Sequence, residues 1–209
     1  MFYYYYDWTY ILVLIGVVLS LLASAKVKST FARYSNVRSY SGMTGRDAAE
    51  KILHRNGIYD VQIIHISGNL TDHYNPTNKT LALSDPVYHS TSVAAIGVAA
   101  HECGHAVQHQ VGYAPLSVRS ALVPAANFGS MISWPLIIIG LMFNGQMSAM
   151  LINLGILLFS LAVLFQLVTL PVEYNASHRA VTLLDSTGIL SGQEVGQTRS
   201  VLSAAALTY

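Results

Sequence analysis

Charged residues are scarce in this sequence. Only 10% of its 209 residues are Asp, Glu, Lys or Arg and 53% are hydrophobic, whereas about 25% of an ordinary soluble chain is charged. Eleven basic against ten acidic residues leave a net charge of +1, so the basic surplus typical of nucleic-acid-binding proteins is missing. The one cysteine, Cys103, excludes an internal disulfide and fits a reducing compartment. The composition argues against a soluble globule and against a nucleic-acid partner.

Two stretches lack charge altogether and mark the bilayer. Residues 8–25 and 120–172 contain no ionisable acidic or basic side chain, and one such group at bilayer depth costs about 2.5–3.5 kcal/mol. A span needs about 17–25 residues, so the first stretch fits one helix and the second fits two, with a break at residues 143–146. We predict a membrane helix over 1–25 and a two-helix hairpin over 120–172, about three transmembrane helices in all.

The N-terminus and the basic residues fix the expected orientation. The start is aromatic, from Tyr3 to Trp8, which suits a membrane interface and lacks the basic region of a cleaved signal peptide. Basic residues instead follow the first span, at Lys26, Lys28, Arg33 and Arg38. We therefore expect a multi-pass protein of the cell membrane with residues 26–119 in the cytoplasm. The hairpin returns residues 173–209 to the same side.

The soluble segments predict a mostly α fold with a small β-hairpin or three-stranded sheet. Residues 44–57 begin with a capping Thr44 and end in Asn-Gly, as a short helix does. Residues 61–68 and 70–84 are rich in β-formers, and the second segment folds back at 75–78. From residue 90 an Ala-rich pattern predicts a helix to about residue 112, and residues 191–194 form a capping-box pattern that opens another helix.

The most specific motif lies inside the Ala-rich helix. His101-Glu102-Cys103-Gly104-His105 fits H-E-x-x-H, in which two histidines four residues apart share one helix face and hold Zn²⁺. Glu102 is then placed to take a proton from a zinc-activated water. Cys103 points away from this face and is interpreted as a small buried residue. The competing interpretation is two unconnected surface histidines.

A catalytic zinc needs a third protein ligand. The extended metzincin motif is excluded because Gln108 and Val111 stand where it requires glycine and histidine. The ionisable candidates downstream are His109, Glu173, His178, Asp185 and Glu194. We favour Glu173, the first charge after the hairpin and on the same side as the motif. The competing interpretation pairs Glu173 with Arg179, and His109 is interpreted as a polar residue or a supporting partner of the ligands.

The segments HECGHAVQHQ, LTDHYNP and LPVEYNASHRA, together with the hairpin, resemble the YugP-like neutral zinc metallopeptidases of bacterial membranes and, more distantly, the HtpX-type proteases. The resemblance implies an integral-membrane, gluzincin-type enzyme with zinc on His101, His105 and Glu173 and with Glu102 catalytic. HtpX-type enzymes carry an aspartate where this chain has Ser177. Relatives continue into a further membrane helix, so we expect this sequence to be a shortened form.

The expected activity is a membrane-embedded, zinc-dependent endopeptidase acting on membrane or misfolded proteins. Its partners would be the lipid bilayer, protein or peptide substrates and proteins of a membrane complex. Candidates for stabilising the transition state or supporting the ligands are His178, His73, Tyr174 and His109. Residues 70–84 either offer a strand edge to an extended substrate or form an ordinary packed hairpin. The alternatives are a catalytically silent zinc-binding scaffold or regulatory subunit, another metal-dependent hydrolase, and a metal-storage protein.

Overall fold

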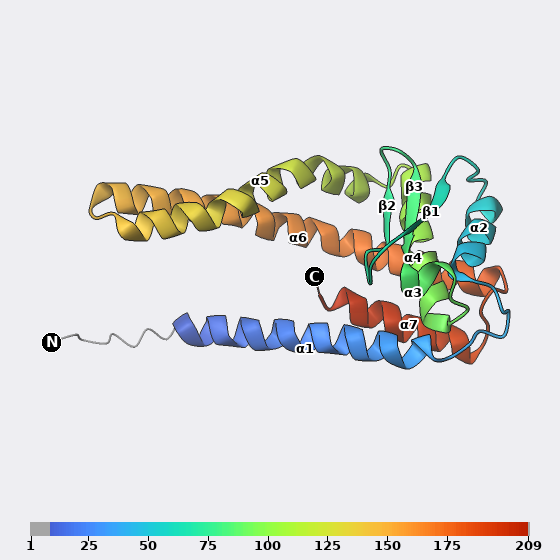
Figure 1. Ribbon diagram of the computed structural model, residues 1–209. Helices are drawn as coiled ribbons and strands as arrows, with labels where there is room; N and C mark the ends of the chain where they lie inside the picture. Colours follow the sequence, from blue (N-terminus) through green and yellow to red (C-terminus); the bar gives the residue numbers. More distant parts are fainter. Residues whose placement is uncertain (1–8, 209) are drawn as a thin grey trace.

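A compact part carries three long apolar helices that project from it in one direction (Figure 1). The structure is a computed structural model and describes residues 9–208. Its elements are α1 (Thr9–Ser35), α2 (Gly45–Arg55), β1 (Gln62–Ile66), β2 (His73–Asn75), β3 (Thr80–Ser84), α3 (Asp85–Tyr88), α4 (Val93–Gln110), α5 (Ala114–Met142), α6 (Gln146–Ser186) and α7 (Gln193–Ala206).

The number of helices long and apolar enough to cross a membrane, within the described residues, is three, as predicted. Helix α1 does not end where the predicted span ends at residue 25, but continues to Ser35. A helix satisfies its backbone hydrogen bonds internally in lipid and in water alike, so the bilayer boundary need not end it. The aromatic stretch from Tyr3 to Trp8 lies outside the described residues.

The hairpin of α5 and α6 turns at residues 143–145, within the predicted break, where Gly145 has a φ of +70°. The two helices pack closely: a Cβ on Gly129 would lie 2.7 Å from the carbonyl oxygen of Leu158. Small residues at such contacts let membrane helices approach each other. Helix α6 then continues through Pro171 into the compact part. No helix end marks the predicted boundary at 172–173.

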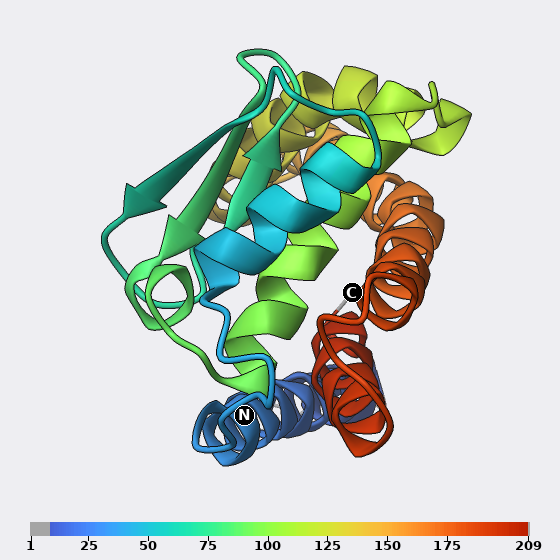
Figure 2. The same cartoon turned by 90° about the vertical axis from the view of Figure 1, so that its right-hand side faces the viewer.

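Helix α4 lies at the centre of the compact part. Figure 2 shows it enclosed by α2 in front, the sheet on one side, α6 and α7 on the other, and α1 at the base. Its N-cap, Ser92, accepts a hydrogen bond from the N–H of Ala95. Most of the helix is buried, and its many alanines allow neighbouring helices to pack against it on several sides.

The sheet has three strands in the order β1-β3-β2. Strand β3 pairs in parallel with β1 and antiparallel with β2, so the three-stranded alternative is confirmed and the hairpin is β2–β3. Strand β3 is paired on both sides only at residues 80–82. The strand edge expected in residues 70–84 is therefore limited to the three-residue β2 and to residues 83–84 beyond the end of β2.

Two of the predicted helix starts differ in their capping. The predicted cap at Thr44 is confirmed, and it forms a complete capping box with Asp47. At α7 the N-cap is Gly192 and no side chain caps the helix. Glu194 instead accepts hydrogen bonds from the N–H groups of Ser191 and Tyr40. This buried carboxylate therefore ties the start of α7 to the loop after α1.

Candidate metal centre

The two motif histidines project from one face of α4 and meet a carboxylate from α6. The rings of His101 and His105 are 4.8 Å apart between centroids and nearly perpendicular. Their Nε2 atoms lie 3.1 Å and 3.6 Å from Oε2 of Glu173. The structure thus brings together the three residues that the sequence and the resemblance single out as zinc ligands.

The spacing of these three donor atoms fits one zinc ion. Protein nitrogen and oxygen ligands lie about 2.0–2.2 Å from Zn²⁺ in a tetrahedral arrangement, which separates ligand atoms by roughly 3.3–3.6 Å. The two nitrogen–oxygen distances of 3.1 Å and 3.6 Å lie close to this range, and all three donor atoms lie within 4.8 Å of one another. Two imidazoles and one carboxylate also form a donor set that catalytic zinc sites use, with the fourth position left open.

The far nitrogen of His105 is held by Gln108, which settles the form of the imidazole. The amide nitrogen of Gln108 donates to the carbonyl of Val172 at 2.8 Å and to the side-chain oxygen of Asn175 at 2.9 Å. A carbonyl can only accept, so the oxygen of Gln108 must face His105, 2.9 Å from Nδ1. Gln108 therefore holds a proton on Nδ1, and Nε2 would be the atom that coordinates a bound metal.

The far nitrogen of His101 contacts Ser177, whose hydroxyl lies 3.1 Å from Nδ1. Ser177 is one turn beyond Glu173 on α6. A hydroxyl in this place orients the ring without adding a negative charge.

Gly104 allows α6 to come close enough for Glu173 to reach the histidines. A Cβ at this position would lie 2.6 Å from the carbonyl oxygen of Ala176, nearer than a real Cβ approaches. The glycine of the motif therefore lies at the contact between the two helices that carry the ligands.

Arg119 is a member of the site that the sequence analysis missed. Its Nη2 lies 3.4 Å from Oε1 of Glu173, the oxygen that faces away from the histidines. Arg179 instead donates to Asn175 at 2.8 Å, so the expected alternative of a Glu173–Arg179 pair is not found. A signal existed: Arg119 is the last charge before the uncharged stretch and Glu173 the first after it, and a hairpin brings its two ends together.

The charges around His105 favour a cation. Burial lowers the pKa of this imidazole, but the hydrogen bond with Glu173 and the negative charges of Glu102 and Glu173 outweigh burial and raise it above its ordinary value. The same negative field that favours a proton on the ring favours a metal ion beside it.

A cavity of about 370 Å³ contains His101, Glu102 and Glu173. The Glu102 residue, 8% exposed, lies in its wall. The other walls come from α1, the loop before β2, and α7. They are formed mostly by small or apolar side chains, namely Val27, Leu70, Leu202, Ala205 and Ala206, and Val98 of α4 adds to them.

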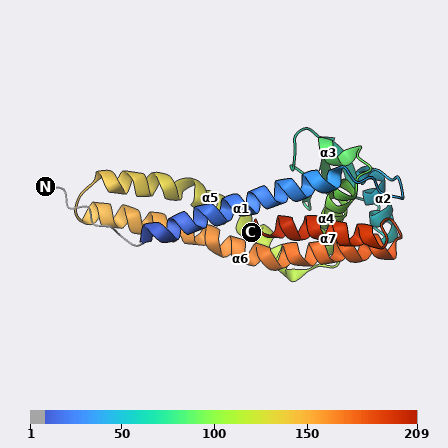
Figure 3. The same ribbon diagram turned by 90° about the horizontal axis from the view of Figure 1, so that it is seen from below.

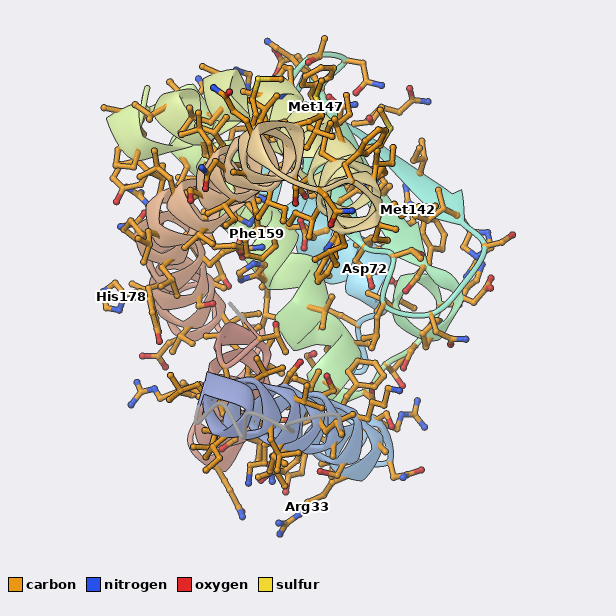
Figure 4. The ribbon with its side chains drawn as sticks, turned by 90° about the vertical axis from the view of Figure 1, so that its left-hand side faces the viewer. Arg33, Asp72, Met142, Met147, Phe159 and His178 are labelled. Carbon is orange, nitrogen blue, oxygen red and sulfur yellow. The ribbon has the colours of Figure 1, made fainter. Side chains whose placement is uncertain are left out.

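The four candidates for transition-state stabilisation lie outside this cavity. Exposed His109 meets the hydroxyl of Tyr74, and His73 hydrogen-bonds with the carbonyl of Thr71. Tyr174 and His178 line a different pocket between α6 and α7, and Figure 4 shows His178 pointing outward from α6. The structure therefore does not bring these four residues to the metal triad.

The structure also shows where the other residues considered in the sequence analysis lie. Asp185 is exposed near the end of α6, and Glu194 is bonded to the backbone as described above. Cys103 is fully buried, with Sγ 3.6 Å from the carbonyl of Ala49, which confirms its interpretation as a small buried residue. Burial raises the pKa of its thiol well above the ordinary value.

Comparison with known proteins agrees with this geometry. Residues 9–209 match the family described as "Putative neutral zinc metallopeptidase". The chain belongs to this family. It is also 50% identical over 191 residues to "Putative membrane protease YugP" of Bacillus subtilis (strain 168), covering 91% of this chain and 84% of that protein. No solved structure matches the chain.

Proposed function

We propose that this chain is a membrane-embedded, gluzincin-type zinc endopeptidase. His101, His105 and Glu173 would hold the metal, and Glu102 would be the general base. The observation that carries the proposal is the convergence of three donor atoms, two of them on residues that line the same cavity as Glu102. The family and the membrane-protease relative support the same activity.

In this proposal each residue has one task. Bound zinc would supply a Lewis acid that polarises the peptide carbonyl and makes water a nucleophile near neutral pH. Glu102 takes the proton from that water and passes it to the leaving amine. Gln108 and Ser177 hold the two imidazoles, and Arg119 holds the carboxylate of Glu173.

The proposal extends to the orientation in the cell membrane. The basic residues after the first span favour a cytoplasmic compact part with the tip of the hairpin on the outside. Proteins of the bilayer or misfolded proteins are then accessible as substrates, and a larger membrane complex is a suitable setting. The net charge of +1 gives no reason to propose a nucleic-acid partner.

The decisive experiment replaces Glu102 by Gln. The amide keeps the volume of the side chain but lacks basicity, so we expect zinc content close to one ion per chain and a loss of peptide cleavage of about 10²–10⁴-fold or more. Zinc would be measured by elemental analysis, and cleavage on an unfolded membrane protein.

Glu50→Gln on the surface of α2 is the matched control, because it makes the same chemical change far from the cavity and should leave both values unchanged. If Glu102→Gln lost less than about tenfold with zinc retained, the general-base assignment would be wrong. A zinc-loaded wild-type chain with no cleavage at all would favour the silent scaffold.

A further inference from the structure

On each of the three apolar helices, a charged residue close to the uncharged run lies at the cavity or at the metal triad. Lys28, three residues past the uncharged run that ends at residue 25, lines the cavity from α1. Glu173 lies three residues past Leu170 on α6, and Arg119, the last charge before the uncharged stretch in α5, contacts it. At about 1.5 Å per helical residue, these side chains are within roughly 5 Å of the ends of the apolar runs.

The cavity therefore lies at the depth of the lipid headgroups rather than above the membrane. Ser24, which also lines it, is still within the uncharged stretch of α1. The apolar runs of α1, α5 and α6 all indicate the same depth for the cavity. The inferred depth therefore does not depend on the exact end of any one run.

The loop before β2 adds an independent observation. Leu70 lines the cavity, is 49% exposed, and has a φ of +57°, a left-handed conformation that a leucine adopts only at a cost in energy. Asp72 holds the end of this loop by accepting hydrogen bonds from the N–H and hydroxyl of Ser84, and Figure 4 places Asp72 on the side seen from the hairpin. An apolar side chain held out at this depth is suited to lipid or to an apolar residue of a substrate.

Helix α1 itself lines the cavity, through Ser24, Val27 and Lys28. Helix α1 packs on α7 and α4 near its C-terminal end, and its apolar side chains from Leu12 to Leu22 are 46–69% exposed. Figures 1 and 3 show α1 and the α5–α6 hairpin extending in the same direction from the compact part. A second apolar helix in the bilayer can therefore lie against α1 with its end at the cavity.

We propose that the substrate is a membrane-anchored polypeptide cleaved at the bilayer boundary, within a few residues of the end of its apolar helix. The anchor lies in the bilayer beside α1, and the extended segment that follows enters the cavity with an apolar side chain against Leu70, Val98 and Leu202. This inference rests on the proposed peptidase activity and adds the position of the scissile bond.

The depth of the cavity is tested first, without any substrate. Leu70→Cys and Thr208→Cys would each carry an environment-sensitive fluorophore in phosphatidylcholine vesicles containing lipids brominated near the headgroup. Lys51→Cys on α2, at the end of the compact part opposite the hairpin (Figure 1), is the control. We expect at least twofold quenching at both cavity positions and none at residue 51. Cavity positions that are as little quenched as residue 51 would overturn the proposal.

Cleavage is then measured on a series of single-span substrates in the same vesicles. In three anchored substrates the same cleavable sequence starts 2, 10 or 25 residues from the membrane anchor. A fourth substrate is a soluble peptide that contains this sequence without an anchor. Because the effective concentration of a tethered site falls steeply with linker length, we expect the 2-residue substrate to be cleaved about tenfold faster than the 25-residue one. The Glu102→Gln chain is the blank.

The outcomes separate the two proposals. If the wild type cleaves the soluble peptide and the 25-residue substrate but spares the 2-residue one, or cleaves both anchored substrates equally, the boundary site is wrong and the peptidase stands. If the zinc-loaded wild type cleaves no member of the series, the peptidase proposal itself fails.

Discussion

The two oxygens of Glu173 have different partners. Oε2 faces both histidines, and Oε1 faces Arg119. The third ligand is thus approached from one side by α4 and from the other by the first turns of α5. Its carboxylate is 6% exposed, so without a cation or a metal beside it the charge would be buried at a high cost.

The ligand assignment predicts zinc loss in single variants. Replacing His101, His105 or Glu173 by Ala removes one of three protein donors, so bound zinc should fall strongly in each variant, measured by elemental analysis after dialysis. Asp185→Ala is the control, since its exposed carboxylate lies far from the cavity. Full zinc occupancy in Glu173→Ala would exclude Glu173 as the third ligand.

Arg119 is predicted to support zinc binding without touching the metal. Supporting partners of ligands typically contribute 10–100-fold to metal affinity, so Arg119→Ala should weaken zinc binding by about that factor, measured by competition with a chelator. Arg119→Lys should recover part of the affinity because it keeps the charge. Arg33→Ala is the control, as Arg33 points outward from α1 (Figure 4). Wild-type affinity in Arg119→Ala would contradict this role.

At the scale of elements, the site depends on the contact between α4 and α6. Gly104 lies against the backbone of Ala176, and the side chain of Gln108 reaches across to the carbonyl of Val172. The close contact at Gly104 and the hydrogen bond of Gln108 together hold α4 and α6 in the positions that bring the three ligands together. Because α6 enters from the hairpin without a break, the position of Glu173 also depends on a helix that begins in the predicted membrane span.

Gly104→Ala is predicted to damage both stability and metal binding. The added methyl group would lie 2.6 Å from a backbone carbonyl, and overpacking of this kind typically costs about 1–3 kcal/mol. We expect a lower free energy of unfolding in detergent and weaker zinc binding, since α6 must move away from the histidines.

Gly196→Ala in α7 is the matched control, because a Cβ there meets no atom within 4 Å. It should be neutral or stabilise the protein by up to about 1 kcal/mol through helix propensity. Equal behaviour of the two variants would show that the close contact at Gly104 is not needed.

At the scale of the whole molecule, parts far apart in sequence form one site. The cavity takes its walls from α1, α4, α6 and α7 and from the loop before β2. We therefore predict that residues 26–119 and 173–209 share one side of the membrane. The end of α1 and the end of α6 both lie in the compact part (Figure 3).

Labelling of introduced cysteines tests this arrangement. Thr77→Cys and Ser186→Cys should react with a membrane-impermeant maleimide from the same side, and Asn144→Cys at the hairpin turn from the other. The unaltered chain is the control: Cys103 is buried and burial raises the pKa of its thiol, so it should stay unlabelled until the protein is denatured. If residues 77 and 186 were labelled from opposite sides of the membrane, the two segments that contain them could not form one metal site.

The sequence by itself determined the features that depend only on local patterns of residues. The absence of charge located three apolar helices, because each ionised side chain in lipid is costly wherever the chain goes next. The spacing of His101 and His105 placed both on one helix face, because the helical repeat fixes that geometry. The cap at Thr44 and the buried Cys103 followed from the same local physics.

The tertiary structure decided what depends on packing between distant segments. It determined that Arg119 and Gln108 support the ligands, that α1 and α7 wall the cavity, and that His73, His109, Tyr174 and His178 face elsewhere. It also set the strand order, in which β3 separates β1 from β2. Such contacts depend on how whole helices and strands orient as they bury apolar surface together, and no local repeat in the chain encodes that orientation.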